Sequence, residues 1–227
     1  MSTRVKIAIF ISGRGTNMVR LLEACKLPDF PAVPVLVLSN TPDAPGIEAA
    51  RQAGIATTTL LREDFPSRQE YDSALNQALQ AVNVDLVCLA GFMQMLSKDF
   101  VHTWRDAMIN IHPSLLPSFK GLNSHQRVLE RGVKFTGCTV HYVRYEMDTG
   151  PIIAQAVVPV VEGDTADTLA ARVLAAEHRT YPHALKMVAS RGVRVDGEHL
   201  VSTLKETPEN QLPTLFSPAI DDDFYSR

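Results

Sequence analysis

Short apolar runs alternate with amphipathic segments over the first 90 residues, and this alternation is the strongest constraint on the fold. Residues 5–11, 33–38, 55–61 and 85–90 are predicted to be strands, with helices at about residues 17–24, 44–53 and 67–82. The fourth apolar run is nearly continuous, as in a parallel strand that is covered on both faces. Strands and helices that alternate through short connections predict a doubly wound α/β fold.

The second half of the chain departs from this alternation. Residues 97–103, 124–131 and 165–189 are predicted to be helices, and residues 107–111 a strand. Residues 135–143 and 152–160 are predicted to be two strands that add to the sheet in antiparallel orientation, and residues 193–202 a small hairpin. The predicted fold is therefore a mostly parallel sheet with helices on both faces and antiparallel additions in the C-terminal half.

Residues 1–205 are predicted to form a single domain, because the length suits one and we find neither an internal repeat nor a strong linker. From residue 206 to residue 227 the chain is rich in proline and polar residues. That composition is typical of a poorly structured C-terminal tail.

Composition bears on the partners and the compartment. The net charge is −3 and no more than two basic residues are adjacent, so nucleic acid is not an expected partner. The three cysteines are far apart in sequence, and neither they nor the histidines show metal-ligand spacing, so we expect a reducing compartment and no metal. The apolar run at residues 7–11 is too short for a signal peptide or a membrane span, which predicts a cytoplasmic protein that does not bind membranes.

The segment Asn110-Ile-His-Pro113 ends one predicted strand. Side chains two residues apart on a strand point the same way, so Asn110 and His112 are expected to face one spot. Pro113 holds His112 in extended geometry. An amide donor beside an imidazole suits a site in which a carbonyl oxygen gains charge. A strand end with a capping Asn and a hydrogen-bonded His accounts for the spacing equally well.

A glycine-rich turn, Gly13-Arg-Gly-Thr-Asn17, follows the first predicted strand. Such a turn brings backbone amides close to a ligand at a helix N-terminus, where an anion is favoured. The spacing matches neither the dinucleotide fingerprint nor the P-loop. We favour phosphate binding over the alternative, a tight turn in which Thr16 or Asn17 caps the helix.

Asp148 lies in the turn between the two predicted antiparallel strands. Turn formation alone accounts for an Asp there. A carboxylate within about 4–6 Å of His112 would raise the imidazole pKa above its usual value of about 6.5. The apolar loop that follows the fourth strand, residues 91–96, offers backbone amides to a flat heterocycle, or it belongs to the core.

Taken together, these segments resemble the glycinamide ribonucleotide formyltransferases, folate-dependent enzymes of purine synthesis. The resemblance covers residues 5 to 190 approximately, in order, and leaves out the tail. The matching segments are residues 11–17, 38–40, 49–55, 89–93, 110–117, 148–151 and 177–178.

The resemblance implies transfer of the formyl group of 10-formyltetrahydrofolate to the amine of glycinamide ribonucleotide, without a metal. It implies a catalytic set of Asn110, His112 and Asp148, in which the first two stabilise a tetrahedral intermediate and Asp148 keeps the imidazole charged and aids proton transfer. The implied ribonucleotide contacts are Gly15, Thr16 and Asn17 at the phosphate and Glu177 at the ribose. The implied folate contacts are Arg68, Met93, Gln94, Met95, Leu96, Asn110 and Val143.

Three positions depart from the family's common pattern: Gln94 replaces a basic residue, and Lys120 and Asn123 replace Pro and His. The nearest alternative is formyltetrahydrofolate hydrolase, which usually carries a regulatory domain ahead of the catalytic one; a first strand at residue 5 leaves no room for that domain. Methionyl-tRNA formyltransferase is a weaker alternative, since we find no basic surface of the kind that binds RNA. An alternative from a different functional class is a non-catalytic module that binds the phosphate of a nucleotide. The chain is expected to be a monomer or a homodimer.

Overall fold

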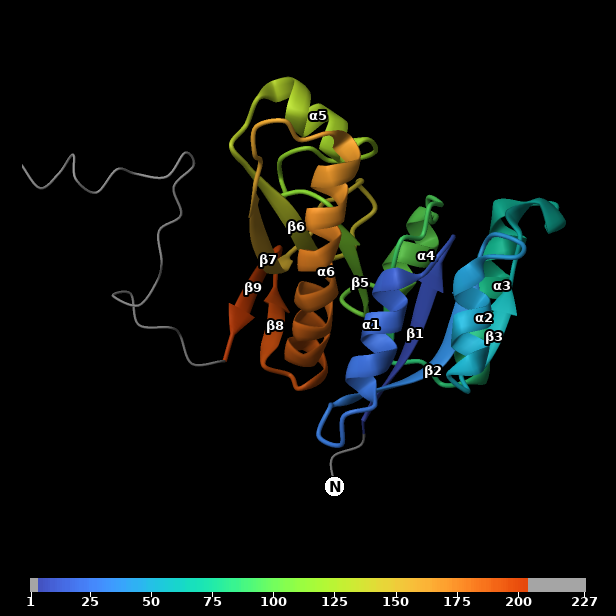
Figure 1. The fold of residues 1–227 in the computed structure, drawn as a ribbon. Helices are drawn as coiled ribbons and strands as arrows, with labels where there is room; N and C mark the ends of the chain where they lie inside the picture. The colour runs from blue at the N-terminus through green and yellow to red at the C-terminus, as the bar shows by residue number, and fades with distance from the viewer. Residues whose placement is uncertain (1–3, 204–227) are drawn as a thin grey trace, which may run out of the picture.

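A seven-stranded sheet forms the centre of the molecule in a computed structural model, which describes residues 4–203 (Figure 1). The strand order is β3-β2-β1-β4-β5-β6-β7. The first five strands in sequence pair in parallel, and β6 and β7 add in antiparallel orientation. The strands are β1 (Val5–Ile11), β2 (Ala32–Ser39), β3 (Thr57–Thr59), β4 (Leu86–Leu89), β5 (Met108–His112), β6 (Phe135–Tyr142) and β7 (Ile152–Pro159). The predicted fold class is confirmed.

Helices cover both faces of this sheet (Figure 1). One face carries α1 (Thr16–Cys25), α2 (Pro45–Gln52) and α6 (Ala166–Ala189), and the other carries α3 (Arg68–Ala81) and α4 (Lys98–Thr103). Strand β1 supplies both cores, because Ile9 and Ile11 point to the first face while Ala8 and Phe10 point to the second. This two-sided burial explains why the strand sequence is apolar at every position from Ile7.

The C-terminal half builds a third apolar cluster, in which Val128 of α5 (Ser124–Arg131), Cys138 of β6 and Leu169 of α6 pack together. The predicted hairpin near residue 197 is also confirmed. It forms a separate two-stranded sheet of β8 (Val193–Asp196) and β9 (His199–Ser202). The predicted tail at residues 206–227 lies outside the described residues.

One local expectation was wrong. The strand expected at residues 55–61 is reduced to Thr57–Thr59, because β3 is an edge strand whose ladder pairs those residues with Val37–Ser39 at the end of β2. In the glycine-rich turn, the alternative that Thr16 or Asn17 caps the helix does not hold. Gly15 takes the cap position in the left-handed conformation, with φ at 66°.

All three cysteines are buried as free thiols. Burial raises the pKa of Cys25 and of Cys138 to about 11, and it raises the pKa of Cys88 further. Such thiols act as small apolar side chains in the core rather than as nucleophiles.

No helix among residues 4–203 is long and apolar enough to cross a membrane.

Candidate active site

The site lies where the strand order changes direction. Strands β1 and β4 are neighbours, but the chain continues from β1 toward β3 and from β4 toward β7. In doubly wound sheets this switch point opens a crevice at the carboxyl ends of the strands. The glycine-rich turn follows β1, the loop 91–96 follows β4, and Asn110 and His112 end the next strand, β5.

The glycine-rich turn is held against the start of α2. The Gly46 amide donates to the Gly13 carbonyl at 3.1 Å. A Cβ on Gly46 would stand 2.5 Å from the Ile11 side chain and 3.0 Å from the Gly13 oxygen, so glycine is needed for this approach. The first backbone amides of α1 have no partner within the helix and face the turn. The arrangement supplies donors of the kind that bind a phosphate.

A chain of hydrogen bonds connects the ends of three strands. The Ser12 hydroxyl, after β1, donates to Asn40 Oδ1 at 2.5 Å, after β2. The same hydroxyl accepts the Met93 amide at 2.7 Å, after β4. Asn40 Nδ2 then donates to Gln94 Oε1 at 3.0 Å. The turn and the loop 91–96 are thus one connected rim. These roles of Ser12 and Asn40 were not predicted from the sequence.

His112 and Asp148 meet in space although 36 residues separate them in sequence. His112 Nδ1 lies 3.3 Å from Asp148 Oδ2, and both side chains are about nine-tenths buried. The other ring nitrogen, Nε2, lies 3.0 Å from the Phe119 carbonyl oxygen. The Asp148 carboxylate also accepts the Gly121 amide at 2.6 Å. Each ring nitrogen therefore faces an oxygen.

The loop that carries Asp148 folds back along the sheet. Strand β6 ends with Tyr142 opposite Ile109, three residues before His112, yet Asp148 reaches the imidazole. The return of the loop to β7 requires Gly150, which has φ at 112° and whose Cβ would stand 2.2 Å from the Tyr142 carbonyl oxygen. Strand periodicity could not place Asp148 beside His112, because their contact depends on this return of the loop.

His141 orients the Asn110 amide. It is the cross-strand partner of Asn110, is 2% exposed, and its Nε2 lies 3.3 Å from Asn110 Nδ2. Burial lowers the pKa of His141, and its Nδ1 faces the carbonyl oxygens of Tyr142 and Thr149 at 2.9 and 3.1 Å. The proton of the neutral ring therefore sits on Nδ1, and Nε2 accepts from the Asn110 amide. His141 is thus a core histidine whose ring nitrogens both have partners, one of which is the Asn110 amide.

Glu177 of α6 is joined to Asn17 at the start of α1. Asn17 Nδ2 donates to Glu177 Oε2 at 2.7 Å, and both residues are buried. Burial raises the pKa of Glu177, although the Asn17 bond opposes the shift. Asn17 Oδ1 is buried without a partner among the described residues. The expected ribose and phosphate contacts are therefore brought together.

A cavity of about 100 Å³ opens beside Asn110 and Asp148. Its walls are largely apolar and include Asn110 and His141, which suits a flat heterocycle with hydrogen-bonding edges. Five of the expected folate residues line it: Gln94, Met95, Leu96, Asn110 and Val143. Exposed Met95, Tyr145 and Met147 continue the apolar surface outward at its rim.

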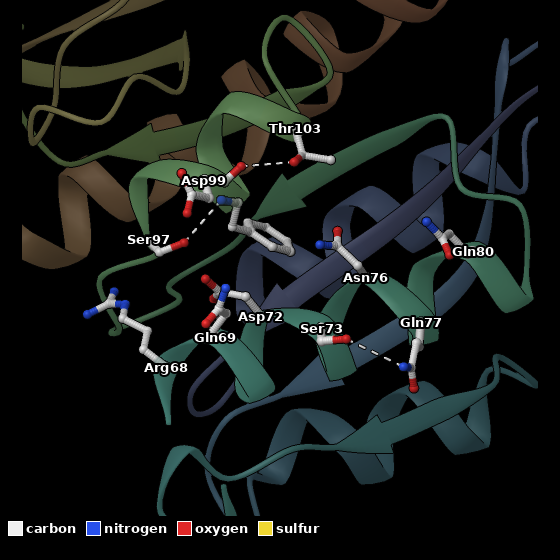
Figure 2. A pocket seen from close by; sticks show the side chains of 11 residues that line it. Arg68, Gln69, Asp72, Ser73, Asn76, Gln77, Gln80, Ser97, Asp99 and Thr103 are labelled. Carbon is white, nitrogen blue, oxygen red and sulfur yellow. Dashed lines mark hydrogen bonds between the residues drawn. The ribbon is translucent and has the colours of Figure 1, made fainter. Parts of the chain in front are cut away.

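Two expected folate residues lie elsewhere. Met93 is 68% exposed and does not line the cavity, and Arg68 donates from Nη2 to the Met95 carbonyl. Arg68 lies at the edge of a larger groove of about 740 Å³ between α3 and α4 (Figure 2). That groove contains none of the expected catalytic residues.

The described residues contain no group of three or more His, Cys, Asp or Glu side chains arranged to hold a metal ion.

Comparison with known proteins assigns the family. Residues 5–185 match the family described as formyl transferase. The chain belongs to this family. The assignment confirms the resemblance found in the sequence and the class of enzyme that it implied. The match includes every residue of the expected site.

Three similar proteins illustrate the relation. The phosphoribosylglycinamide formyltransferase of Escherichia coli strain K12 is 44% identical over 185 residues, which cover 82% of this chain and 87% of that enzyme. The crystal structure of glycinamide ribonucleotide transformylase 1 from Symbiobacterium toebii superposes with a TM-score of 0.86 at 42% sequence identity. The superposition covers 89% of this formyl transferase chain and 95% of the crystallised chain. The trifunctional purine biosynthetic protein adenosine-3 of Gallus gallus is 50% identical over 194 residues, or 86% of this chain. The chain spans only 19% of that protein's length.

Proposed function

We propose that this chain transfers the formyl group of 10-formyltetrahydrofolate to the amine of glycinamide ribonucleotide in purine synthesis. The printed names of the bacterial relatives, with coverage of most of both chains, support this substrate pair. The observation that carries the proposal is the convergence of His112 and Asp148 beside the cavity that Asn110 lines. A binding module would leave this convergence unexplained.

The substrates would occupy two connected parts of the rim. Gly15, Thr16 and Asn17 would hold the phosphate at the start of α1, and Glu177 would bind the ribose hydroxyls. The cavity lined by Gln94, Met95, Leu96 and Val143 would receive the heterocycle of the folate. The remainder of the folate would lie across the exposed rim, toward Arg68 and Met93.

Asn110 and His112 would stabilise the oxygen of the formyl group as the amine adds to the carbonyl carbon. The Asn110 amide keeps one hydrogen to donate to that oxygen, because His141 accepts only the other. In the proposed mechanism His112 would act as the doubly protonated, positively charged ring, and the oxygens that face its two ring nitrogens would accept both N–H hydrogens. Its charge, on the same side of β5, stabilises the negative oxygen.

Asp148 would carry the proton. An imidazole that already holds two protons has no lone pair with which to accept another, so His112 cannot act as the base. Through water, the Asp148 carboxylate would take the proton that the attacking nitrogen loses and deliver it to the folate nitrogen that leaves. The reaction then needs neither a covalent intermediate on the protein nor a metal.

The deciding experiment is a turnover assay with the formyl folate and the ribonucleotide. We expect formylated ribonucleotide to form in equal amount to the folate consumed. Formate release without the ribonucleotide would favour the alternative function, formyltetrahydrofolate hydrolase. Binding of the ribonucleotide without either reaction would favour a non-catalytic module. The cytoplasmic location, the lack of nucleic-acid and membrane partners, and the monomeric or dimeric state remain predictions; sedimentation velocity measures the last.

A further inference from the structure

We propose that Glu198, in the turn between β8 and β9, positions the loop that carries Asp148, and that it acts through Arg144. The inference deepens the proposed function and rests on it, because the loop borders the proposed folate cavity. Residue 198 lies beyond the family match, which ends at residue 185, so the resemblance assigns it no role.

Arg144 is the centre of the contact. It lies two residues after the end of β6, is 9% exposed, and lines the same cavity as Asn110 and Asp148. Its Nε donates to Glu198 Oε2 at 2.9 Å and its Nη2 donates to Asp106 Oδ1 at 2.8 Å. The buried guanidinium is thus held between two carboxylates from separate parts of the chain.

These contacts hold both ends of the loop. Asp106 lies two residues before β5, the strand that carries Asn110 and His112. At the far end of the loop, a Cβ on Gly150 would stand 3.0 Å from Arg144 Cγ, so the loop closes on the stem of this side chain. Arg144 therefore connects the start of β5, the loop and the C-terminal hairpin.

Glu198 is the group that ties this connection to the hairpin. Its second oxygen, Oε1, accepts from Arg105 Nη2 at 2.6 Å. The bonds from Arg105 and Arg144 lower the pKa of the Glu198 carboxyl, so the group is ionised at neutral pH. Without it, Asp106 would be the one charged partner left to this nine-tenths buried guanidinium among residues 4–203. A buried charge that loses a partner is costly, so Arg144 would turn toward water and the loop would move with it.

The first test compares two carboxylates of one hairpin. Glu198→Ala should lower kcat/KM for formyl folate about three- to tenfold while KM for the ribonucleotide changes less than twofold. The matched control is Asp196→Asn, since the Asp196 carboxylate is exposed and its one ion pair within the described part of the chain is with exposed Arg194, at 3.8 Å. Equal effects of the two changes, or no effect of Glu198→Ala, would overturn the proposal.

A second measurement does not depend on activity. Amide hydrogen exchange in residues 143–150 should be faster in Glu198→Ala than in the wild type, and unchanged in Asp196→Asn. Arg144→Met should speed exchange in the same residues at least as much, because it removes the contact with Asp106 as well as the contact with Glu198. Unchanged exchange in Glu198→Ala contradicts the positioning role even if the wild type proves inactive. Inactivity of the wild type would reject the proposed function alone.

Discussion

At the scale of single residues, His112 and Asp148 give the sharpest prediction. His112→Ala should lower kcat about 100- to 1000-fold, since losing one group that stabilises a developing oxyanion commonly costs about 3–4 kcal/mol. Asp148→Ala should cause a loss of similar size, because the imidazole would lose the oxygen 3.3 Å from Nδ1. Steady-state kinetics with both substrates measures this, and an unchanged circular dichroism spectrum is the control. Turnover close to that of the wild type in either variant would contradict the mechanism.

Glu177 gives a prediction in which stability and function oppose each other. Because burial raises its pKa, the folded state holds this proton more tightly than the unfolded state. Its contribution to the unfolding free energy therefore falls as pH rises from about 4.5 through the raised pKa. Glu177→Gln keeps an acceptor for Asn17 and removes the buried charge, so it should be more stable by roughly 1–2 kcal/mol at pH 8.

Urea unfolding of both proteins at pH 4 and pH 8 tests this expectation. The difference between them should shrink at pH 4, where the wild-type carboxyl is protonated in the folded state. The variant should also show a higher KM for the ribonucleotide, because a carboxylate that binds hydroxyls is lost. A variant that is less stable than the wild type at pH 8 would mean that burial is not the dominant influence on Glu177.

At the scale of elements, the start of α6 is held by a cluster of side-chain hydrogen bonds. Asp164, just before the N-cap Thr165, binds Arg172 through both oxygens at 2.8 Å, and it also accepts from Val161 and Thr168. These bonds, chiefly those of Arg172, hold the pKa of Asp164 well below its usual value. Asp164→Asn should reduce the unfolding free energy at pH 7 by about 1–2 kcal/mol.

The effect of this substitution should depend on pH. A carboxyl with a lowered pKa in the folded state stabilises fully above about pH 4, and the benefit is lost as pH falls further. Urea midpoints of the wild type and Asp164→Asn should therefore converge toward pH 2.5. The control is Asp167→Asn in the same turn, which removes an exposed charge and should change the midpoint far less.

The bounds of helices and strands were predicted well where burial determines the local pattern of apolar residues. Helix α5 has the predicted bounds, and β1 and the β6–β7 pair agree within one residue, because their apolar periodicity matches the faces that they bury. Strand β3 was overestimated, since its length depends on where β2 ends rather than on its own residues. In the site, Asn110 and His112 followed from strand periodicity. The contacts of Ser12, Asn40 and His141 depend on which strands are neighbours, and a single strand's sequence does not contain that information.

At the scale of the whole molecule, the prediction of one domain can be tested with the single tryptophan. Trp104 packs on the α3–α4 face and donates to Asn76 at 2.9 Å, so its fluorescence reports that face alone. Far-ultraviolet circular dichroism reports all the helices, of which α6 on the other face is the longest. If one sheet holds both cores together, the two urea transitions should coincide. Separate midpoints would show that the faces unfold independently.

The burial of every native thiol has a practical consequence. A maleimide reagent reacts with the thiolate form of cysteine. In the folded protein Cys25, Cys88 and Cys138 are buried, and their raised pKa values leave almost no thiolate to react. A cysteine placed at an exposed position such as Leu122, which is 74% exposed, would then be the one that takes a fluorophore. The wild-type protein can therefore be labelled at a single introduced cysteine without replacing any cysteine of the core.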